Sequence, residues 1–236
     1  MGSDSLKYNM PIKILNLIIY NGGQPHLETM RNHVSTYLKN FVNSDEIYLQ
    51  HYFISFREQE EEIMFEDDIM WLKGVESRVP GILDKTLKAI RYWLEKDGTF
   101  DLIVRSNSST AINFKKFPYK EIATGYAAPH CLTMYWLDPE ANITDHRYDG
   151  VVFASGTCIV LTKETAKLLI SVPVEPIIDD VAIGAMLFGR VQLQKLSTPL
   201  LSDSNQLGGV FYRHNSSSET RMADADAMGH TYAGFQ

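Results

Sequence analysis

The 236-residue sequence has few of the features that mark secreted, membrane-spanning or nucleic-acid-binding proteins. It contains only two cysteines, Cys131 and Cys158, so a disulfide framework is not indicated and reduced thiols are the simpler interpretation. Lys and Arg number 22 against 29 Asp and Glu, which gives a net charge of −7 and argues against a nucleic-acid partner. No window approaches the ~20 apolar residues of a membrane span, and residues 1–10 lack the apolar core of a signal peptide. We therefore expect a soluble, cytoplasmic protein without a membrane span.

The chain also lacks internal repeats and the G-x-G-x-x-G fingerprint of dinucleotide-binding proteins. A methyltransferase or a nicotinamide-dependent reductase is therefore the weaker interpretation. The hydrophobic content of 44% and the alternation of strand-like and helix-like segments predict a single α/β domain over residues 1–236. Residues 1–10 and about 216–236 are expected to be flexible, unless the C-terminal tail folds over the site.

The N-terminal segment predicts the first strand and helix of a parallel sheet. The apolar run IKILNLIIY ends at Asn21 and is followed by Gly22, Gly23 and the helix-like residues 26–41. Ligands of open α/β sheets bind at the carboxyl ends of the strands, which here carry Tyr20 and Asn21. A plain strand-to-helix turn explains the glycine pair equally well.

Residues 153–189 combine a strand, a capped helix and a pair of carboxylates. Ser155-Gly156-Thr157 interrupts the apolar run VVFASGTCIVL and predicts a kinked strand. Thr162 precedes a helical apolar stripe and predicts an N-cap, and prolines 173 and 176 end that helix. Asp179 and Asp180 then stand before a second helical segment. A carboxylate at a helix N-terminus is favoured in its ionised form and suits a general base, although capping the helix is the common role of such a residue.

This block resembles the C-terminal half of the β-1,3-galactosyltransferase and fringe families. The matching motifs are Ala154-Ser155-Gly156, Thr162-Lys163-Glu164 and Asp179-Asp180-Val181-Ala182-Ile183-Gly184, in the family's order. The resemblance implies a GT-A (Rossmann-like) fold with a central, mostly parallel sheet flanked by helices. It also implies an inverting hexosyl- or pentosyltransferase with a nucleotide-sugar donor, a UDP-linked one by preference. Asp180 is the favoured catalytic base, with Asp179 as the alternative.

The same resemblance extends upstream to residues 65–93. There it matches an acidic segment, a Glu-Ser pair at Glu76 and Ser77, and a helix that carries Lys85 and Thr86. Independently, the apolar residues 83, 87, 90 and 94 share one helical face, which predicts a buried amphipathic helix. By the same comparison the nucleotide base and ribose would lie near Tyr20 and Asn21.

The strand predicted from Phe100 to Val104 runs into a polar loop that differs from the family pattern. Most GT-A enzymes carry a D-x-D motif there, whose carboxylates hold Mn²⁺ or Mg²⁺ against the donor diphosphate. The matching residues are Asn107, Ser108 and Ser109, and none is a carboxylate, so metal dependence is doubtful. An Asx or Ser turn that merely ends a strand remains an alternative for this loop.

The segment Arg105-Ser-Asn-Ser-Ser is similar to a variant in small glycosyltransferases of large algal DNA viruses and some bacteria, which makes a virus-encoded enzyme one possibility. If metal is weakly bound or absent, cationic side chains must stabilise the departing diphosphate. The candidates are Arg105, Lys85, Arg78, Arg213 and His214, and Gly156 would let backbone pass close to the donor. Ser109 and His214 are the candidate metal ligands, if there is a metal at all.

Residues 119–150 are rich in aromatic residues and predict contacts to a glycan acceptor. Tyr135, Trp136 and Asp149 are the candidates, although core packing explains each aromatic ring singly. A second hypothesis follows from the altered loop at 107–109. The chain could be a catalytically degenerate GT-A domain that binds a glycan or nucleotide without turning it over.

Overall fold

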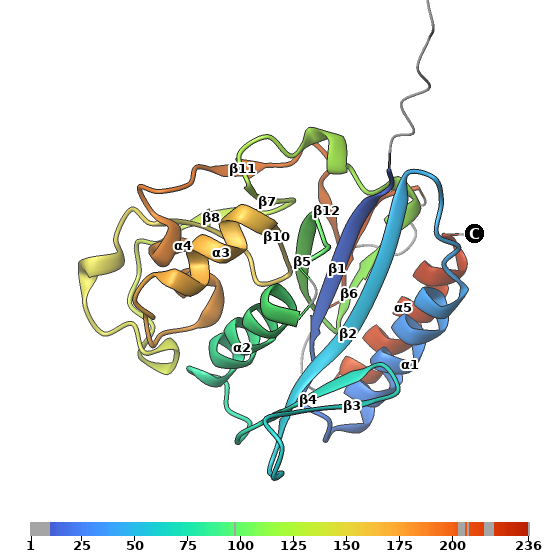
Figure 1. Ribbon diagram of the computed structural model, residues 1–236, viewed down its shortest axis with the longest axis horizontal. Helices are drawn as coiled ribbons and strands as arrows, with labels where there is room; N and C mark the ends of the chain where they lie inside the picture. Colours follow the sequence, from blue (N-terminus) through green and yellow to red (C-terminus); the bar gives the residue numbers. More distant parts are fainter. Residues whose placement is uncertain (1–9, 97, 203–205, 207, 215–219, 236) are drawn as a thin grey trace, which may run out of the picture.

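The computed structural model describes residues 10–96, 98–202, 206, 208–214 and 220–235. Its centre is an eight-stranded mixed sheet with the strand order β11–β7–β10–β5–β1–β2–β4–β3 (Figure 1). The strands of this sheet are β1 (Ile12–Ile19), β2 (Ile47–Arg57), β3 (Ile63–Glu66), β4 (Ile69–Lys73), β5 (Leu102–Asn107), β7 (Tyr126–Ala128), β10 (Cys158–Thr162) and β11 (Leu193–Lys195).

Two smaller sheets and five α-helices complete the described part of the chain. The small sheets contain β6 (Thr110–Ile112), β12 (Leu200–Leu201) and β13 (Phe211–Arg213), and β8 (Cys131–Thr133) with β9 (Val152–Ala154). The helices are α1 (Pro25–Asn40), α2 (Gly81–Lys96), α3 (Lys163–Ser171), α4 (Asp179–Leu187) and α5 (Arg221–Ala233). Short 3₁₀ turns span Phe114–Lys116, Tyr119–Glu121, Pro139–Ala141 and His146–Tyr148. None of the helices in the described ranges is both long and apolar enough to cross a membrane.

The middle of the large sheet is parallel, and this places two strand ends side by side. β1 pairs in parallel with both β2 and β5, and Ile19 is opposite Asn107 in the β1–β5 register. The residues that follow these two strands therefore meet at one edge of the sheet. β10 runs antiparallel between β5 and β7, and β3 is antiparallel to β4.

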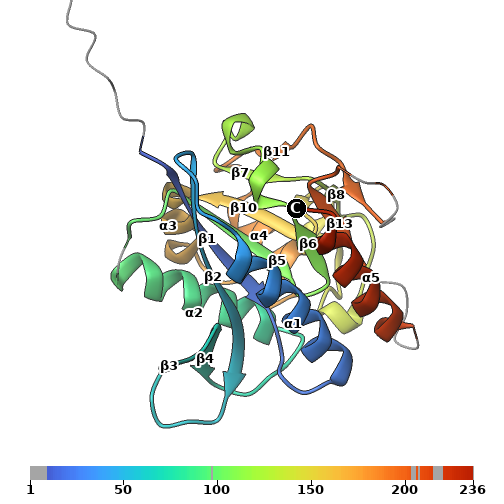
Figure 2. The ribbon, with the colours of Figure 1, turned by 90° about the vertical axis from the view of Figure 1, so that its right-hand side faces the viewer.

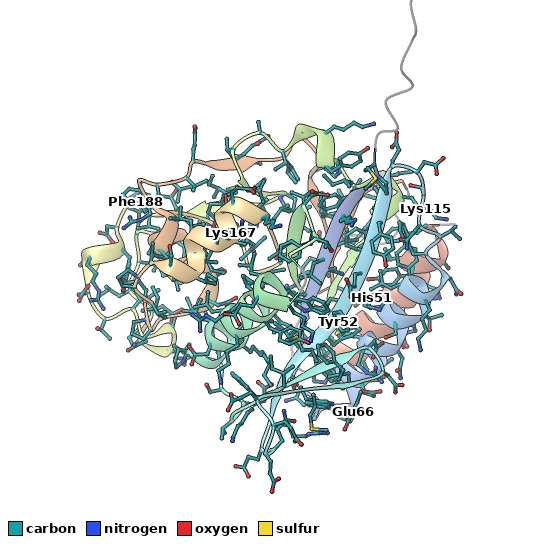
Figure 3. The ribbon with its side chains drawn as sticks, in the orientation of Figure 1. His51, Tyr52, Glu66, Lys115, Lys167 and Phe188 are labelled. Carbon is teal, nitrogen blue, oxygen red and sulfur yellow. The ribbon has the colours of Figure 1, made fainter. Side chains whose placement is uncertain are left out.

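Helices cover both faces of the sheet, as the predicted α/β class requires. Alternation along β1 directs Leu15 and Leu17 to one apolar core and Ile14 and Ile18 to the other. The first core lies under α2, α3 and α4, and the second lies under α1 and α5 (Figures 1 and 2). The same alternation separates neighbours on β2. Tyr52 stacks on Trp93 of α2 at a centroid distance of 5.0 Å, whereas His51 lies on the α1 side, in a hollow that Lys39 also lines (Figure 3).

The kinked strand predicted around Gly156 is two strands in different sheets. β9 pairs with β8, the chain turns at Ser155 and Gly156, and β10 then enters the large sheet. Thr162 caps α3 as predicted, because its side chain accepts a hydrogen bond from the backbone N–H of Thr165. The turn matters for the site because it brings the backbone of Gly156 to the first residues of α4.

The C-terminal tail differs from the expected flexible segment wherever the structure describes it. Residues 221–233 form α5, which lies along α1 (Figure 2) and buries Ala225, Met228 and Tyr232. Tyr232 stacks on Tyr37 of α1 at a centroid distance of 4.8 Å. These apolar contacts order a segment that is otherwise polar. Residues 1–9, 216–219 and 236, which fall within the two stretches expected to be flexible, lie outside the described residues.

Candidate functional site

The two aspartates of the Asp179-Asp180 pair have different surroundings at the N-terminus of α4. Asp179 is 4% exposed, and its carboxylate forms an ion pair with Arg105, which is 1% exposed. Burial raises the pKa of Asp179 above its ordinary value, and the charge of Arg105 opposes that shift. The carboxylate of Asp179 is thus paired with a buried guanidinium and is poorly placed to take a proton from a substrate.

Asp180 is half-buried, and backbone N–H groups hold its carboxylate. Its Oδ2 accepts a hydrogen bond of 3.0 Å from the N–H of Gly156, and its Oδ1 accepts one of 2.9 Å from the N–H of Val181. A Cβ atom on Gly156 would lie 3.2 Å from Nη1 of Arg105 and 3.3 Å from Oδ2 of Asp180. Glycine at this position therefore lets both functional side chains approach the turn.

Arg105 belongs to β5 instead of the polar loop expected there. The strand continues to Asn107, because Arg105 and Ser106 pair with Ile159 and Cys158 of β10. The guanidinium also donates to the carbonyl oxygen of Gly156 and, at 3.1 Å, to Oδ1 of Asn107. Arg105 therefore connects β5, the Gly156 turn and α4. It lies beneath the site, where we expect it to position other groups.

A cleft of about 440 Å³ opens where β1 and β5 end. Polar and cationic side chains line most of it, together with a few apolar residues from β1, α1 and α2. The lining residues are Ile19, Tyr20, Asn21, His26, Leu27, Met30, Glu76, Ser77, Arg78, Ile82, Lys85, Asn107, Ser108, Ser109, Arg213 and Arg221. Eight of the donor-binding candidates thus come together from distant parts of the sequence: Tyr20, Asn21, Arg78, Lys85, Asn107, Ser108, Ser109 and Arg213.

Among these eight, the side chains of Tyr20, Arg78, Lys85 and Asn107 hydrogen-bond to other groups of the protein. Lys85 Nζ donates to the backbone oxygen of Tyr20 at 2.6 Å and to both carboxylate oxygens of Glu76 at 3.0 and 2.9 Å. Its three donors are thereby used, so Lys85 stabilises the end of β1 and has none left for a phosphate. The hydroxyl of Tyr20 donates to Glu28, and burial, first among several causes, raises the pKa of Tyr20 to about 12.

Arg213 lies at the boundary between the cleft and a second cavity. This second cavity has a volume of about 360 Å³ and is lined by His130, Ser155, Thr157, Leu200, Leu201, Ser202 and Arg213. In the part of the chain that the structure describes, Asp180 lines neither the cleft nor the second cavity. However, Gly156, whose N–H holds Asp180, lies between Ser155 and Thr157 of the second cavity.

His214 points away from the cleft. It is 5% exposed, its Nε2 lies 3.0 Å from Oγ1 of Thr231, and its backbone N–H donates to the oxygen of Ser109. The ring therefore links β13 to α5 within the protein. Ser109 and His214, the two candidates for a metal site, are thus neighbours through their backbones, but only Ser109 lines the cleft, and the ring of His214 is bonded to Thr231.

The aromatic candidates for the acceptor are exposed and lie outside both spaces. Tyr135 is 67% exposed and has no core-packing role, whereas Trp136 is 47% exposed and its ring contacts the buried ring of Phe153 at a centroid distance of 6.4 Å. Oδ2 of Asp149 lies 3.0 Å from Nδ1 of His146, which belongs to the same irregular segment. These three residues form an exposed polar and aromatic region, separate from the lining of the cleft.

Two residues of the site were missed from the sequence. Arg221 lines the cleft from the first turn of α5, in a tail that was expected either to be flexible or to fold over the site. The helical spacing of Ala225, Met228 and Tyr232 is the signal that could have found α5. Glu76 was noted only as part of a motif. It accepts hydrogen bonds from Ser55 and the N–H of Phe56 as well as from Lys85, and no local pattern indicates this role.

Neither a protein-family model nor a curated protein sequence matches this chain. Two similar solved structures are glycosyltransferases. The catalytic domain of Drosophila β1,4-galactosyltransferase 7, solved in complex with xylobiose, is 12% identical with a TM-score of 0.35, and the match covers 67% of this chain and 52% of that chain. This chain thus spans about half of that domain. A glycosyltransferase involved in the glycosylation of the major capsid of PBCV-1 is 12% identical with a TM-score of 0.48, covering 92% of this chain and 99% of the other. At these TM-scores neither likeness bears on the chemistry of the site.

Proposed function

We propose that this chain is an inverting glycosyltransferase that moves a sugar from a UDP-linked donor to a hydroxyl of a glycan acceptor. The proposal is supported by the order of the Ser-Gly, Thr-cap and Asp-Asp-Val-x-x-Gly motifs and by the polar cleft at the ends of β1 and β5. Ligands of open α/β sheets bind at such an edge, where two neighbouring strands end. The cleft offers Tyr20 and Asn21 to the nucleoside and Asn107, Ser108 and Ser109 to ribose or phosphate oxygens.

The observation that carries the proposal is the position of Asp180. Its carboxylate lies at the N-terminus of α4 and accepts a hydrogen bond from the N–H of Gly156. Gly156 lies between Ser155 and Thr157, which line the second cavity. The positive end of a helix favours a negative group at this place. Asp179 is occupied by Arg105, which leaves Asp180 as the accessible carboxylate of the pair.

The acceptor would enter through the second cavity. Its hydroxyl-bearing residues Ser155, Thr157 and Ser202 suit hydrogen bonds to a sugar, and Arg213 connects it to the cleft. Asp180 accepts the proton of the acceptor hydroxyl as that oxygen attacks the anomeric carbon. The bond from this carbon to the diphosphate oxygen breaks, and its electron pair leaves with the diphosphate. An α-linked donor therefore gives a β-linked product.

The proposal is tested by incubating the full chain with a panel of UDP-, GDP- and dTDP-sugars and with methyl glycosides as acceptors. Release of nucleoside diphosphate that rises when an acceptor is added is the expected result. Absence of release with every donor, at protein concentrations where UDP binds, would reject sugar transfer.

That negative result would favour the second hypothesis, a GT-A domain that binds without catalysis. Two observations support this alternative: the loop at Asn107–Ser109 carries no carboxylate, and Asp180 does not line the cleft. Binding of UDP together with no turnover is the result that distinguishes the module from the enzyme.

A further inference from the structure

The residues at the end of β5 are poor ligands for a resident divalent cation. Asn107 already accepts a hydrogen bond from Arg105 through its Oδ1, and Ser108 and Ser109 offer only neutral hydroxyls. The carboxylate of Glu76 in the same cleft is bonded to Lys85. Within the described ranges, no three His, Cys, Asp or Glu side chains are grouped as a metal site would need. The donor set therefore does not fit Mn²⁺ or Mg²⁺.

Arg213 has the opposite character, because it is a cation with unused donors. Its Nε and Nη1 are buried and have no hydrogen-bond partner among the described residues. A buried polar group without a partner costs about 1–3 kcal/mol, and more when it is charged. A guanidinium with unused donors suits a phosphate group, whose oxygens accept charge-assisted hydrogen bonds. The side chain thus has the chemistry of an anion site.

The strand that carries Arg213 places it beside the polar loop. In β13, Arg213 pairs with Thr110 of β6, and the next residue donates its N–H to the oxygen of Ser109. Arg213, Ser108 and Ser109 accordingly line the same cleft. An anion bound by Arg213 would therefore lie within reach of the two serine hydroxyls.

Further positive charge surrounds Arg213. Arg221 lines the cleft from α5, and Arg78 lines it from the segment before α2. Burial, and then the charges of Arg221 and Arg105, lower the pKa of Arg213 to about 10, against the opposing charges of Asp224 and Asp180. Arg213 still keeps its charge at neutral pH. A group of arginines at one edge of a cleft attracts anions and repels a divalent cation.

We propose that Arg213, assisted by Arg221, holds and neutralises the diphosphate of the donor in place of a divalent metal ion. This inference rests on the proposed sugar transfer. As the bond between the anomeric carbon and the diphosphate oxygen breaks, the electron pair remains on the diphosphate, and the guanidinium of Arg213 balances the added negative charge. The acceptor proton goes to Asp180, so no other reactant is needed.

Calorimetric titration of UDP and of inorganic pyrophosphate into the full chain, in EDTA and then in Mn²⁺, tests this site. Both ligands are expected to bind in EDTA, with Mn²⁺ changing the dissociation constants by no more than about 2-fold. Arg213→Met should weaken both by roughly 100-fold, which corresponds to the loss of a charge-assisted pair. Arg91→Met, the same change at an exposed position on α2, should bind as the wild type does.

Folding is checked on the same variants by thermal unfolding. Removal of a buried, unpaired guanidinium should leave Arg213→Met at least as stable as the wild type. If Arg213→Met fails to fold, Arg213→Lys is measured instead, because lysine keeps the positive charge but lacks the planar guanidinium. We expect its affinity in EDTA to lie between that of the wild type and the roughly 100-fold weaker value expected for Arg213→Met. Equal affinity in wild type and Arg213→Lys, or binding that requires Mn²⁺, would overturn the inference.

The two proposals fail in distinguishable ways. Turnover that is lost in EDTA and restored by Mn²⁺ would reject the arginine site while leaving sugar transfer intact. Metal-free, Arg213-dependent binding of UDP without turnover of any donor would leave the anion site in place and reject the transfer reaction.

Discussion

Two neighbouring aspartates show how strongly the environment determines what a residue can do. Asp179 lies in the core against the guanidinium of Arg105, whereas Asp180 is half-buried and bonded to backbone N–H groups. The first carboxylate balances a charge that would otherwise be buried alone. The second keeps an environment in which it can accept a proton. The stability role and the proposed chemical role are therefore separable by mutation.

Asp179→Asn should destabilise the protein by about 3 kcal/mol, because removing one partner of a buried ion pair leaves the other charge uncompensated. Urea unfolding at pH 7.5 measures the effect. Asp180→Asn is the matched control, with an expected loss of about 1 kcal/mol or less, since the amide oxygen can still accept from Gly156. Equal stability of Asp179→Asn and the wild type would show that the ion pair with Arg105 does not contribute as described.

The burial of His51 should make the free energy of unfolding depend on pH. Burial lowers the pKa of His51, with Lys39 adding to the shift and Asp68 opposing it, and its Nε2 is buried without a hydrogen-bond partner among the described residues. Below about pH 6.5 the unfolded chain binds a proton at this histidine that the folded state resists. The free energy of unfolding should therefore fall more steeply in the wild type than in His51→Gln between pH 7.5 and 5. Parallel curves for the two proteins would contradict this.

The sequence predicted residue types at the site better than it predicted their partners. Asp179, Asp180, Asn107 and Ser109 were all singled out, and the structure places them at the ends of α4 and β5. The pairing of Arg105 with Asp179 spans 74 positions, and that of Lys85 with Tyr20 spans 65. Local periodicity contains no information about such contacts. Arg105 and Lys85, two expected donor-binding cations, hydrogen-bond instead to groups of the protein itself.

At the scale of elements, the close packing of α4 on β9 explains the glycine of the Asp-Asp-Val-Ala-Ile-Gly motif. A Cβ atom on Gly184 would lie 2.5 Å from Cβ and 3.1 Å from Cα of Phe153, and 3.2 Å from the oxygen of Val152. These are backbone or backbone-proximal atoms that cannot move aside. Glycine at this position thus lets α4 lie against β9. This packing fixes the position of Asp180 relative to the Gly156 turn.

Gly184→Ala should accordingly destabilise the protein by about 2 kcal/mol, because overpacking against backbone outweighs the ~1 kcal/mol that alanine gains in a helix. Gly23→Ala is the control, since the nearest atom to a Cβ there is 3.8 Å away and Gly23 is exposed. Thermal unfolding of both variants makes the comparison. A Gly184→Ala protein as stable as Gly23→Ala would show that the helix and strand are less tightly packed.

Elements with strong local signals were predicted, and those that depend on tertiary contact were not. The strand before Tyr20, the helix with Leu83, Leu87 and Ile90 on one face, and the Thr162 cap are all present. The helix α5 was not predicted, because its polar composition obscures an apolar stripe that is buried through tertiary contacts, chiefly with α1. The split of the 151–161 run into β9 and β10 was also missed, since both halves are apolar and only their different partners separate them.

At the scale of the whole molecule, the order of the strands determines where the cleft lies. The chain leaves β1, passes through α1 to β2 on one side, and later returns as β5 on the other side of β1 (Figure 1). The segments that follow β1 and β5, which are α1 and β6, both pack into the apolar core under α1 and α5. The small sheet of β6 and β13 brings Arg213 to the cleft. The predicted α/β class was sufficient to expect a site at this edge, and Arg213 was a candidate from the sequence, but the contribution of Arg221 from α5 required the structure.

The most direct test of the account is the turnover of the Asp180→Asn variant beside the wild type, at a saturating concentration of the best nucleotide-sugar and acceptor. The account predicts a kcat about 10³-fold lower in the variant, the magnitude typical of a lost general base, with a UDP dissociation constant within about 2-fold of the wild-type value. A variant that transfers sugar as fast as the wild type would contradict it.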